Sequence, residues 1–238
     1  MPIYQLHPDF VGFPPRSEFE QDMVAVGGDL RVERLLEAYA CGVFPWYNDP
    51  GKLHWYCPEE RCVLPVASIQ VSHSMRGLFR RGELSFSMDT CFPQVIEACR
   101  EGEREGQTWI HDEIVEAYCS LHRLGLAHSL EVWHEERLVG GLYGISLGTL
   151  FFGESMFSRH SNASKAALIR LCQFLPTLSI DLVDCQVPSE HLLSMGAEVR
   201  HRDDFLDTLE IAMEQPTVKG SWSNQFEQWL TKATNNPL

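Results

Sequence analysis

Two polar side chains, Asp184 and Gln186, stand two positions apart in residues 180–187, an apolar segment whose pattern predicts a β-strand. Side chains two apart in a strand point to the same face, so this carboxylate and amide should lie within hydrogen-bonding distance of each other. The pair could take part in catalysis, or it could satisfy its own polar groups at a strand end. Both interpretations stay open on this segment alone.

A carboxylate, Glu154, is embedded in the strongly apolar residues 151–158. Methionine and phenylalanine in such a segment more often form core than a ligand pocket, but an unpaired buried glutamate is costly, so Glu154 indicates a cationic partner or a cavity. The neighbouring Ser155 resembles the nucleophile of a G-x-S-x-G elbow, yet Phe157 replaces the last glycine, and the serine follows a hairpin strand. This context argues against a serine hydrolase.

Eight cysteines are scattered through segments that otherwise read as helix, strand and loop. Cys57 and Cys62 have a spacing that could suit zinc, but Cys91 and Cys99 do not supply the second close pair that a structural zinc site needs. A chain of 238 residues builds a core without disulfides, so we expect reduced thiols and no metal. The remaining cysteines are Cys41, Cys119, Cys172 and Cys185.

The composition is that of a globular protein, with 44% hydrophobic and 22% charged residues. No apolar stretch approaches the ~20 residues that a membrane helix needs, and the N-terminus lacks the features of a signal peptide. We therefore expect a cytoplasmic protein without membrane contact. The net charge of −14 argues against a general nucleic-acid binder, but it leaves room for a local basic patch at Arg76, Arg80 and Arg81. A solvated helix face is the alternative for these arginines.

The first sixty residues differ from the rest, because they combine prolines, paired glycines and many aromatic side chains with one short helix. Asp29 can cap that helix by accepting backbone N–H bonds, and Gly42 can end it. We expect a small aromatic-rich N-terminal α/β domain over residues 1–60 and a larger domain over residues 61–238.

In the larger domain the apolar pattern predicts a helix after Asp89, another from Asp112 to Gly125, and then a meander of three antiparallel strands. Its expected later features are turns at Glu135-Glu136 and Gly148-Thr149, a helix capped by Asn162, the strand of residues 180–187, a short helix closed by Gly196, a strand at residues 197–199 and a last helix around Phe205. This order indicates an α+β fold with a mixed sheet, and it looks like the GNAT-like acyltransferase fold. Topology alone does not determine function.

Several long strings of residues, in order, closely resemble the bacterial leucyl/phenylalanyl-tRNA–protein transferases. The likeness runs from about Phe13 to Phe205. The matching strings are Gly27-Gly-Asp-Leu30, Gly42-Val-Phe-Pro-Trp-Tyr47, Thr108-Trp-Ile110, Ala127-His-Ser-Leu-Glu-Val-Trp133, Val139-Gly-Gly-Leu-Tyr-Gly144, Gly153-Glu-Ser-Met-Phe-Ser158, Asn162-Ala-Ser-Lys165 and Asp184-Cys-Gln186.

The resemblance implies a reaction. Such an enzyme moves leucine, phenylalanine or methionine from an aminoacyl-tRNA to the N-terminal amine of a protein that begins with arginine or lysine, and the product is marked for degradation through the N-degron pathway. The donor is already an activated ester, so the resemblance implies no cofactor. The implied partners are the 3′ aminoacyl-adenosine of the tRNA and the acceptor protein.

The resemblance also implies roles for residues of this sequence. Asp184 and Gln186 match the catalytic pair, with Asp184 polarising the glutamine amide, and Glu154 matches a residue that binds an ammonium group of the donor or the acceptor. The tRNA backbone would contact Arg76, Arg80 and Arg81. The implied binding residues are Leu142, Phe151, Met156, Leu168 and Leu171 for the donor side chain, and Trp46 and Trp109 for the terminal adenosine.

Two rival functions differ in the residues that they require. An acetyl-CoA-dependent acetyltransferase needs a glycine-containing pyrophosphate loop, and residues 159–164 lack glycine. A tRNA-binding module without catalysis would keep the tryptophans and arginines but would not need Asp184 together with Gln186.

Overall fold

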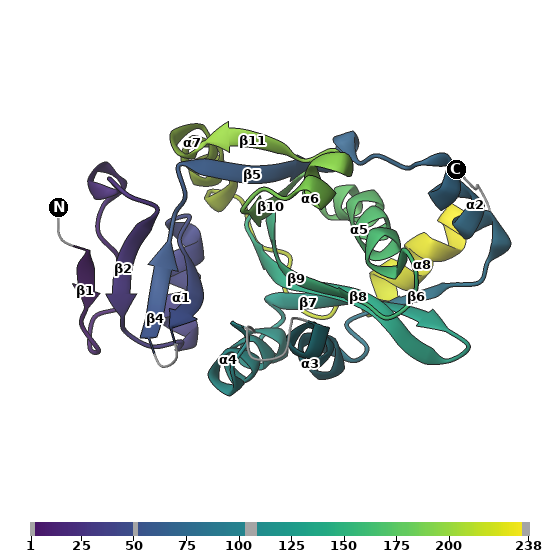
Figure 1. Ribbon diagram of the computed structural model, residues 1–238, viewed down its shortest axis with the longest axis horizontal. Coiled ribbons are helices and arrows are strands. Elements are labelled where there is room, and N and C mark those ends of the chain that lie inside the picture. Colours follow the sequence, from purple (N-terminus) through teal and green to yellow (C-terminus); the bar gives the residue numbers. More distant parts are fainter. Residues whose placement is uncertain (1–2, 50–51, 103–108, 235–238) are drawn as a thin grey trace.

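The computed structural model describes residues 3–49, 52–102 and 109–234, and two sheets divide them (Figure 1). The N-terminal sheet has the strand order β1-β2-β4-β3, and helix α1 (Val32–Ala40) packs beside it. Its strands are β1 (Tyr4–Leu6), β2 (Met23–Gly27), β3 (Phe44–Asp49) and β4 (Lys52–Tyr56).

The larger sheet has seven strands in the order β11-β5-β10-β9-β8-β7-β6. Every neighbouring pair is antiparallel except β9 with β10, so the mixed-sheet α+β class is confirmed, and so is the three-stranded meander β7-β8-β9. The strands are β5 (Glu60–Pro65), β6 (Ser85–Met88), β7 (Ala127–His134), β8 (Arg137–Leu147), β9 (Leu150–Ser158), β10 (Leu182–Gln186) and β11 (Glu198–His201).

Helices cover both faces of this sheet (Figure 1). Helices α3 (Phe92–Gly102) and α4 (Asp112–Arg123) lie on one face, while α2 (His73–Arg81), α5 (Ala163–Phe174) and α8 (Ser223–Thr234) lie on the other. The remaining helices are α6 (Glu190–Ser194), α7 (Arg202–Met213) and the 3-10 turns Arg16–Glu18, Val66–Ser68 and Leu175–Leu178.

The two sheets share one hydrophobic core. The chain passes from one sheet to the other between Tyr56 and Glu60, but Trp55 of the N-terminal sheet belongs to the same buried cluster as Tyr118 and Phe205. The division into residues 1–60 and 61–238 therefore stays a prediction.

Turns and helix ends largely follow the expectations. Gly42, Gly125 and Gly148 have φ of 75°, 70° and 55°, and they lie where α1 ends, where α4 ends and where β8 turns into β9. The turn between β7 and β8 is built by Glu135 and Glu136, with φ of 48° and 62°.

The two expected helix caps differ from the structure. Asp29 accepts the backbone N–H of Arg31, which lies one residue before α1, so it does not bind a helical N–H. Asn162 precedes α5, but its own backbone is left-handed (φ 65°), and its side chain makes no capping bond. The hydroxyl of Ser158 accepts the N–H of Ser164 instead, at 3.3 Å.

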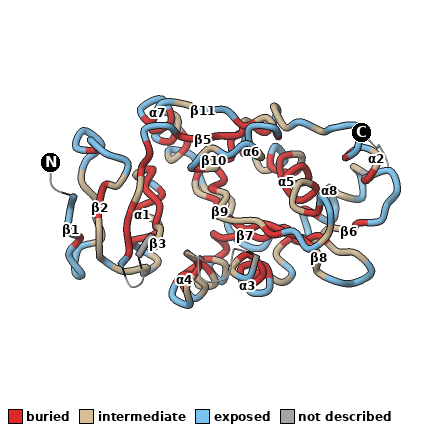
Figure 2. The backbone as a smooth tube through the Cα atoms, viewed as in Figure 1, coloured by how far each residue is buried: buried red, intermediate tan, exposed pale blue. Residues whose placement is uncertain are grey.

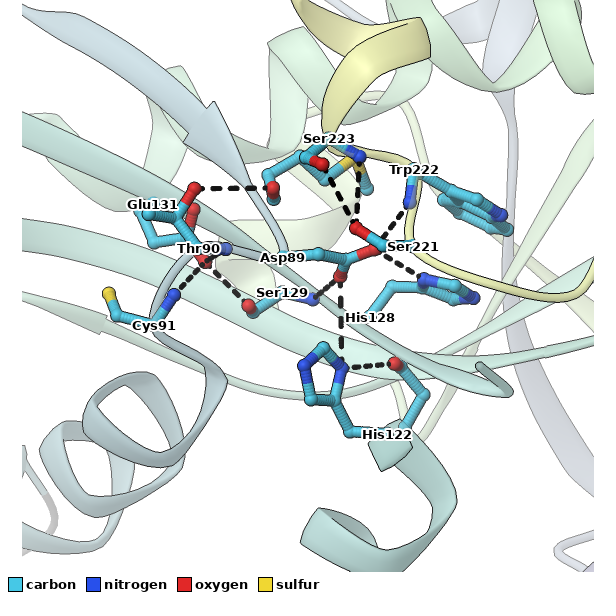
Figure 3. A network of polar contacts seen from close by, with 12 residues as sticks. Asp89, Thr90, Cys91, His122, His128, Ser129, Glu131, Ser221, Trp222 and Ser223 are labelled. Atoms are coloured by element: carbon cyan, nitrogen blue, oxygen red, sulfur yellow. Dashed lines mark hydrogen bonds and ion pairs between the residues drawn. The ribbon is translucent and has the colours of Figure 1, made fainter. Parts of the chain in front are cut away.

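The helix around Phe205 is not the last one, because α8 follows it and is anchored by a buried polar network (Figure 3). Asp89 accepts bonds from Nδ1 of His128 (2.9 Å) and from the backbone N–H groups of Ser129 (3.0 Å) and Trp222 (2.7 Å). The rings of His128 and Trp222 stack with centroids 3.5 Å apart. The network therefore ties the start of α8 to β7 and to the segment after β6.

Candidate active site

A cavity opens where β9 and β10 separate. Their parallel register runs from Leu150 with Leu182 to Phe152 with Asp184. Beyond that point a cavity of about 260 Å³ lies between β8, β9, β10, α5 and α6. Figure 2 shows the middle of β9 as only partly buried although β9 is the central strand, which fits a strand that borders a cavity.

The cavity wall contains every apolar residue that the sequence assigned to the donor side chain. Leu142 of β8 and Met156 of β9 are direct cross-strand partners, and α5 supplies the wall opposite the sheet. The structure thus brings together Leu142, Phe151, Met156, Leu168 and Leu171, and Glu154 and Gln186 line the same space.

Glu154 enters the site from a bulge in β9. Gly153 pairs with Gly144 and Ser155 pairs with Tyr143, so Glu154 is the extra residue between them. A bulge breaks the strict alternation of a strand and re-aims a side chain. Here it brings the carboxylate to the cavity wall, as the embedded position in the sequence had indicated.

The partners of Glu154 are neutral hydrogen-bond donors rather than a cation. The hydroxyls of Tyr39 and Tyr118 donate to its two oxygens at 2.7 and 3.0 Å, and Nε2 of Gln186 donates at 3.2 Å. Burial raises the pKa of Glu154 to about 7, although the two tyrosine hydrogen bonds oppose that rise. A carboxyl with this pKa exchanges its proton near neutral pH, as groups at reactive sites often do.

Asp184 and Gln186 do not form the contact expected between their side chains. Asp184 is fully buried, and its carboxylate forms a two-pronged ion pair with Arg61 at 2.8 and 2.6 Å. It also accepts the backbone N–H of Gln186 at 3.0 Å. The register of β10 shifts between Asp184 and Gln186, and Gln186 has φ of 56°, so the two side chains leave the alternation that would have paired them.

Sequence reasoning missed Arg61, Tyr39 and Tyr118. Arg61 lies 123 positions from Asp184, and the tyrosines lie 115 and 36 positions from Glu154. Only the embedded carboxylate signalled that such partners must exist, and it did not say where in the chain they lie.

The two tryptophans assigned to adenosine lie outside the cavity. Trp46 lines a neighbouring cleft of about 820 Å³, together with Tyr56 and with Val187, the residue after Gln186. Trp109 is partly buried against the core beside α4 and lines neither that cleft nor the cavity.

The three arginines assigned to tRNA form an exposed surface on α2. Arg76, Arg80 and Arg81 are all exposed, and Arg81 pairs with Glu83 at 2.6 Å. In Figure 1, α2 lies at the opposite end of the molecule from β1 and away from the cavity strands β9 and β10.

The described residues contain neither a metal-binding cluster nor a membrane-spanning helix. No group of three or more histidine, cysteine, aspartate or glutamate side chains there is arranged to hold a metal ion. Within the same ranges, no helix has the length and apolar character to cross a membrane.

Comparison with known proteins gives a consistent match over most of the chain. A family model described as leucyl/phenylalanyl-tRNA protein transferase matches residues 63–210, and a model of that protein's N-terminal domain matches residues 28–59. Relatives named leucyl/phenylalanyl-tRNA–protein transferase occur in Anaeromyxobacter dehalogenans (48% identical, covering 93% of this chain and 96% of the relative) and Syntrophus aciditrophicus (48%, 95% and 96%). Another, from Pseudomonas putida, is 46% identical, with coverage of 90% and 96%.

Solved structures resemble this chain in fold alone. FemX has a TM-score of 0.50 at 10% identity and covers 75% of this chain and 71% of its own. A GCN5-related N-acetyltransferase from Anabaena variabilis has a TM-score of 0.44 at 14% identity, with coverage of 59% and 37%.

Proposed function

This chain belongs to the leucyl/phenylalanyl-tRNA protein transferase family and is therefore a transferase, and we propose that its cavity binds the amino acid of an aminoacyl-tRNA for transfer to a protein N-terminus. The observation that carries this proposal is the apolar cavity with Glu154 and Gln186 on one wall. Leucine, phenylalanine and methionine suit such a space, and the adaptable Met156 side chain can adjust to each of them.

Gln186 is the residue best placed to contact the attacking amine. Its Nε2 donates to Glu154, which leaves its carbonyl oxygen as an acceptor for an N–H of the incoming amine. A glutamine amide is too weak a base to remove a proton by itself at neutral pH. Much of the acceleration would therefore come from holding the amine against an ester that is already reactive.

Asp184 acts in this proposal as a positioning residue. Its carboxylate fixes the backbone of Gln186 and is itself held by Arg61. The sequence-based role, in which Asp184 polarises the glutamine side chain directly, has no matching contact.

Glu154 is proposed to bind an ammonium group. In its ionised form it can accept a charge-assisted hydrogen bond, and the two tyrosine hydroxyls keep it oriented toward the cavity. The ammonium can belong to the donor amino acid or to the acceptor, and both would lie at the reacting ester.

We further propose that acceptors begin with arginine or lysine and that transfer marks them for degradation in the cytoplasm. The cleft next to Gln186 supports a cationic acceptor, because its acidic lining residues Asp22, Glu59 and Glu60 outnumber the basic Arg200 and His201. Trp46 in the same cleft can stack on the terminal adenosine. The adenosine role of Trp109 rests on the family resemblance alone.

Acetyl transfer from coenzyme A is the rival on a similar fold, and the backbone after β9 disfavours it. The N–H groups of Arg159 and His160 both donate to the carbonyl of Val139, and that of Ala163 donates to His160. A pyrophosphate loop needs its backbone N–H groups directed at the ligand. These three N–H groups are instead bonded to carbonyl groups of the protein.

The test is incubation with phenylalanyl-tRNA and a peptide that begins with arginine. Mass spectrometry should detect the peptide extended by phenylalanine, and the same peptide with an acetylated N-terminus should stay unmodified. Absence of this product, together with acetylation of the peptide from acetyl-CoA, would overturn the proposal.

A further inference from the structure

Two cysteines, Cys62 and Cys185, oppose each other at the edge of the cavity proposed to bind the donor amino acid, hereafter the donor cavity. In the pairing of β10 with β5, Asp184 faces Val63 and Gln186 faces Cys62, so Cys185 is the extra residue of a bulge. Two residues of a bulged strand oppose one residue of its partner. Cys185 and Gln186 therefore both oppose Cys62.

Both cysteines pack in the same hydrophobic cluster and neither is in a disulfide, but they differ in access. The thiol of Cys185 donates to the backbone carbonyl of Val183 at 3.9 Å, and each of the two thiols shifts the pKa of the other. Cys62 is fully buried, whereas Cys185 is partly exposed and lines the donor cavity. A small molecule that enters the cavity therefore reaches Cys185 before Cys62.

We propose that Cys185 and Cys62 form a modification site at which hydrogen peroxide produces a disulfide that stops aminoacyl transfer. The disulfide itself follows from the thiol geometry, and only its effect on transfer rests on the function proposed above.

The chemistry needs one peroxide for each disulfide. The sulfur of Cys185 attacks one peroxide oxygen, the O–O bond breaks, and a sulfenic acid and one water result. The sulfur of Cys62 then attacks the Cys185 sulfur, an S–S bond replaces the S–O bond, and hydroxide leaves with the Cys62 proton as a second water. Two thiols are oxidised in total, and one peroxide is reduced to two waters.

The local electrostatics assign the second step to Cys62. The neighbouring Cys185 thiol lowers the pKa of Cys62 and outweighs burial and the charge of Asp184, which raise it, while the charge of Arg61 also lowers it. The thiolate is the nucleophile in such exchanges, so Cys62 suits the resolving role. The Cys62 thiol and burial raise the pKa of Cys185, so oxidation should need elevated peroxide.

A disulfide here would act on catalysis through the bulge. The bulge aims Gln186 at Glu154, and Cys185 forms part of the cavity wall. Drawing Cys185 toward β5 would change both features, so transfer should fall while the rest of the fold is retained.

The test treats the whole protein with hydrogen peroxide, blocks the remaining thiols, and maps disulfides by mass spectrometry of a non-reduced digest. A peptide pair joined through Cys62 and Cys185 should appear, most of the transfer activity should be lost, and dithiothreitol should restore it. The Cys62→Ala variant should keep its transfer activity before treatment, form no such pair, and lose less activity than wild type at the same dose of peroxide. If Cys62→Ala folds poorly, Cys62→Val fills the same space.

The Cys172→Ala variant is the matched control, because Cys172 lies near Cys185 and should not be needed. Its treated form should still contain the Cys62 to Cys185 pair. No pair in wild-type protein, or a bridge from Cys185 to Cys172, would overturn the proposal. A protein that forms the disulfide but shows no transfer even before oxidation would refute the proposed function and leave the disulfide standing.

Discussion

At the scale of single residues, Glu154 determines the character of the site. Burial raises the pKa of its carboxyl to about 7 against the lowering effect of the two tyrosine hydrogen bonds, so its charge changes near neutral pH. The sequence could indicate a cavity around this glutamate, since a lone carboxylate in an apolar strand needs one. It could not indicate Tyr39 or Tyr118, because nothing in a sequence shows which helix face will meet a distant strand.

The first prediction concerns the pH dependence of transfer. Binding an ammonium requires the ionised form of Glu154, so kcat/KM should rise as the pH increases through about 7. Glu154→Gln should remove this rise. At pH values above the rise it should lower kcat/KM by about 10- to 100-fold, which is the range for one hydrogen bond to a charged group. Single-turnover assays between pH 5.5 and 8 would measure both effects. A rise that persists in the variant would assign it to another group.

The raised pKa of Glu154 also predicts that the stability of the protein depends on pH. The folded-state pKa of about 7 exceeds the ordinary value of 4.5, so the folded protein holds the proton more tightly than the unfolded chain does. The stability that this proton contributes is fully present below pH 4.5 and is lost as the pH rises through about 7. The free energy of unfolding of wild-type protein should fall relative to Glu154→Gln over this interval in urea titrations. A constant difference would contradict the raised pKa.

At the scale of elements, two bulges on neighbouring strands build the site. One aims Glu154 from β9, and the other places Cys185 and Gln186 on β10. The sequence predicted β10 and the meander correctly, because their apolar alternation and turns are local signals. Strict alternation paired Asp184 with the Gln186 side chain, and that was wrong, because a bulge has no clear signature in a single sequence.

The buried ion pair behind β10 gives the next prediction. Asp184→Ala would leave Arg61 buried without its partner, which typically costs about 3–5 kcal/mol, and would free the backbone of Gln186. We expect kcat to fall much more than the KM for the aminoacyl-tRNA changes. Asp184→Asn keeps an oxygen that can accept the Gln186 N–H, so it should recover part of kcat. Equal kcat values for the two variants would argue against a positioning role.

The next prediction concerns the proposed contact between helix α2 and the tRNA backbone. Replacing Arg76, Arg80 and Arg81 with serine should raise the KM for aminoacyl-tRNA and reduce its salt dependence, since each lost phosphate contact lowers the log–log slope by about 0.7–0.9. Transfer from a short aminoacyl-adenosine donor should be unchanged. Equal losses with both donors would mean that α2 supports the fold rather than the tRNA.

At the scale of the whole molecule, one continuous core carries the N-terminal sheet, and a polar network holds the C-terminal helix. The sequence indicated the class of fold from element order, but it did not reveal α8, whose anchor joins residues 89, 128 and 222. Long-range contacts of this kind leave no periodic signal. They decide where a terminal helix packs.

Asp89 is the test of that anchor. Asp89→Ala would leave the buried N–H groups of Ser129 and Trp222 without acceptors, at a cost of about 1–3 kcal/mol each. Asp89→Asn keeps one oxygen and tolerates the left-handed backbone at this position (φ 56°), so it should lose less stability. The midpoint of thermal unfolding should be highest for wild type, lower for Asp89→Asn and lowest for Asp89→Ala. An Asp89→Ala variant as stable as wild type would show that the network does not hold α8.

The most direct measurement of the central claim is an experimental structure with a non-hydrolysable phenylalanyl-adenosine analogue. The account predicts the phenyl ring in the cavity against Leu142, Met156 and Leu168, with an ammonium at Glu154 and the carbonyl carbon beside Gln186. An analogue whose ring lies outside the cavity, while the protein still transfers phenylalanine, would contradict the account.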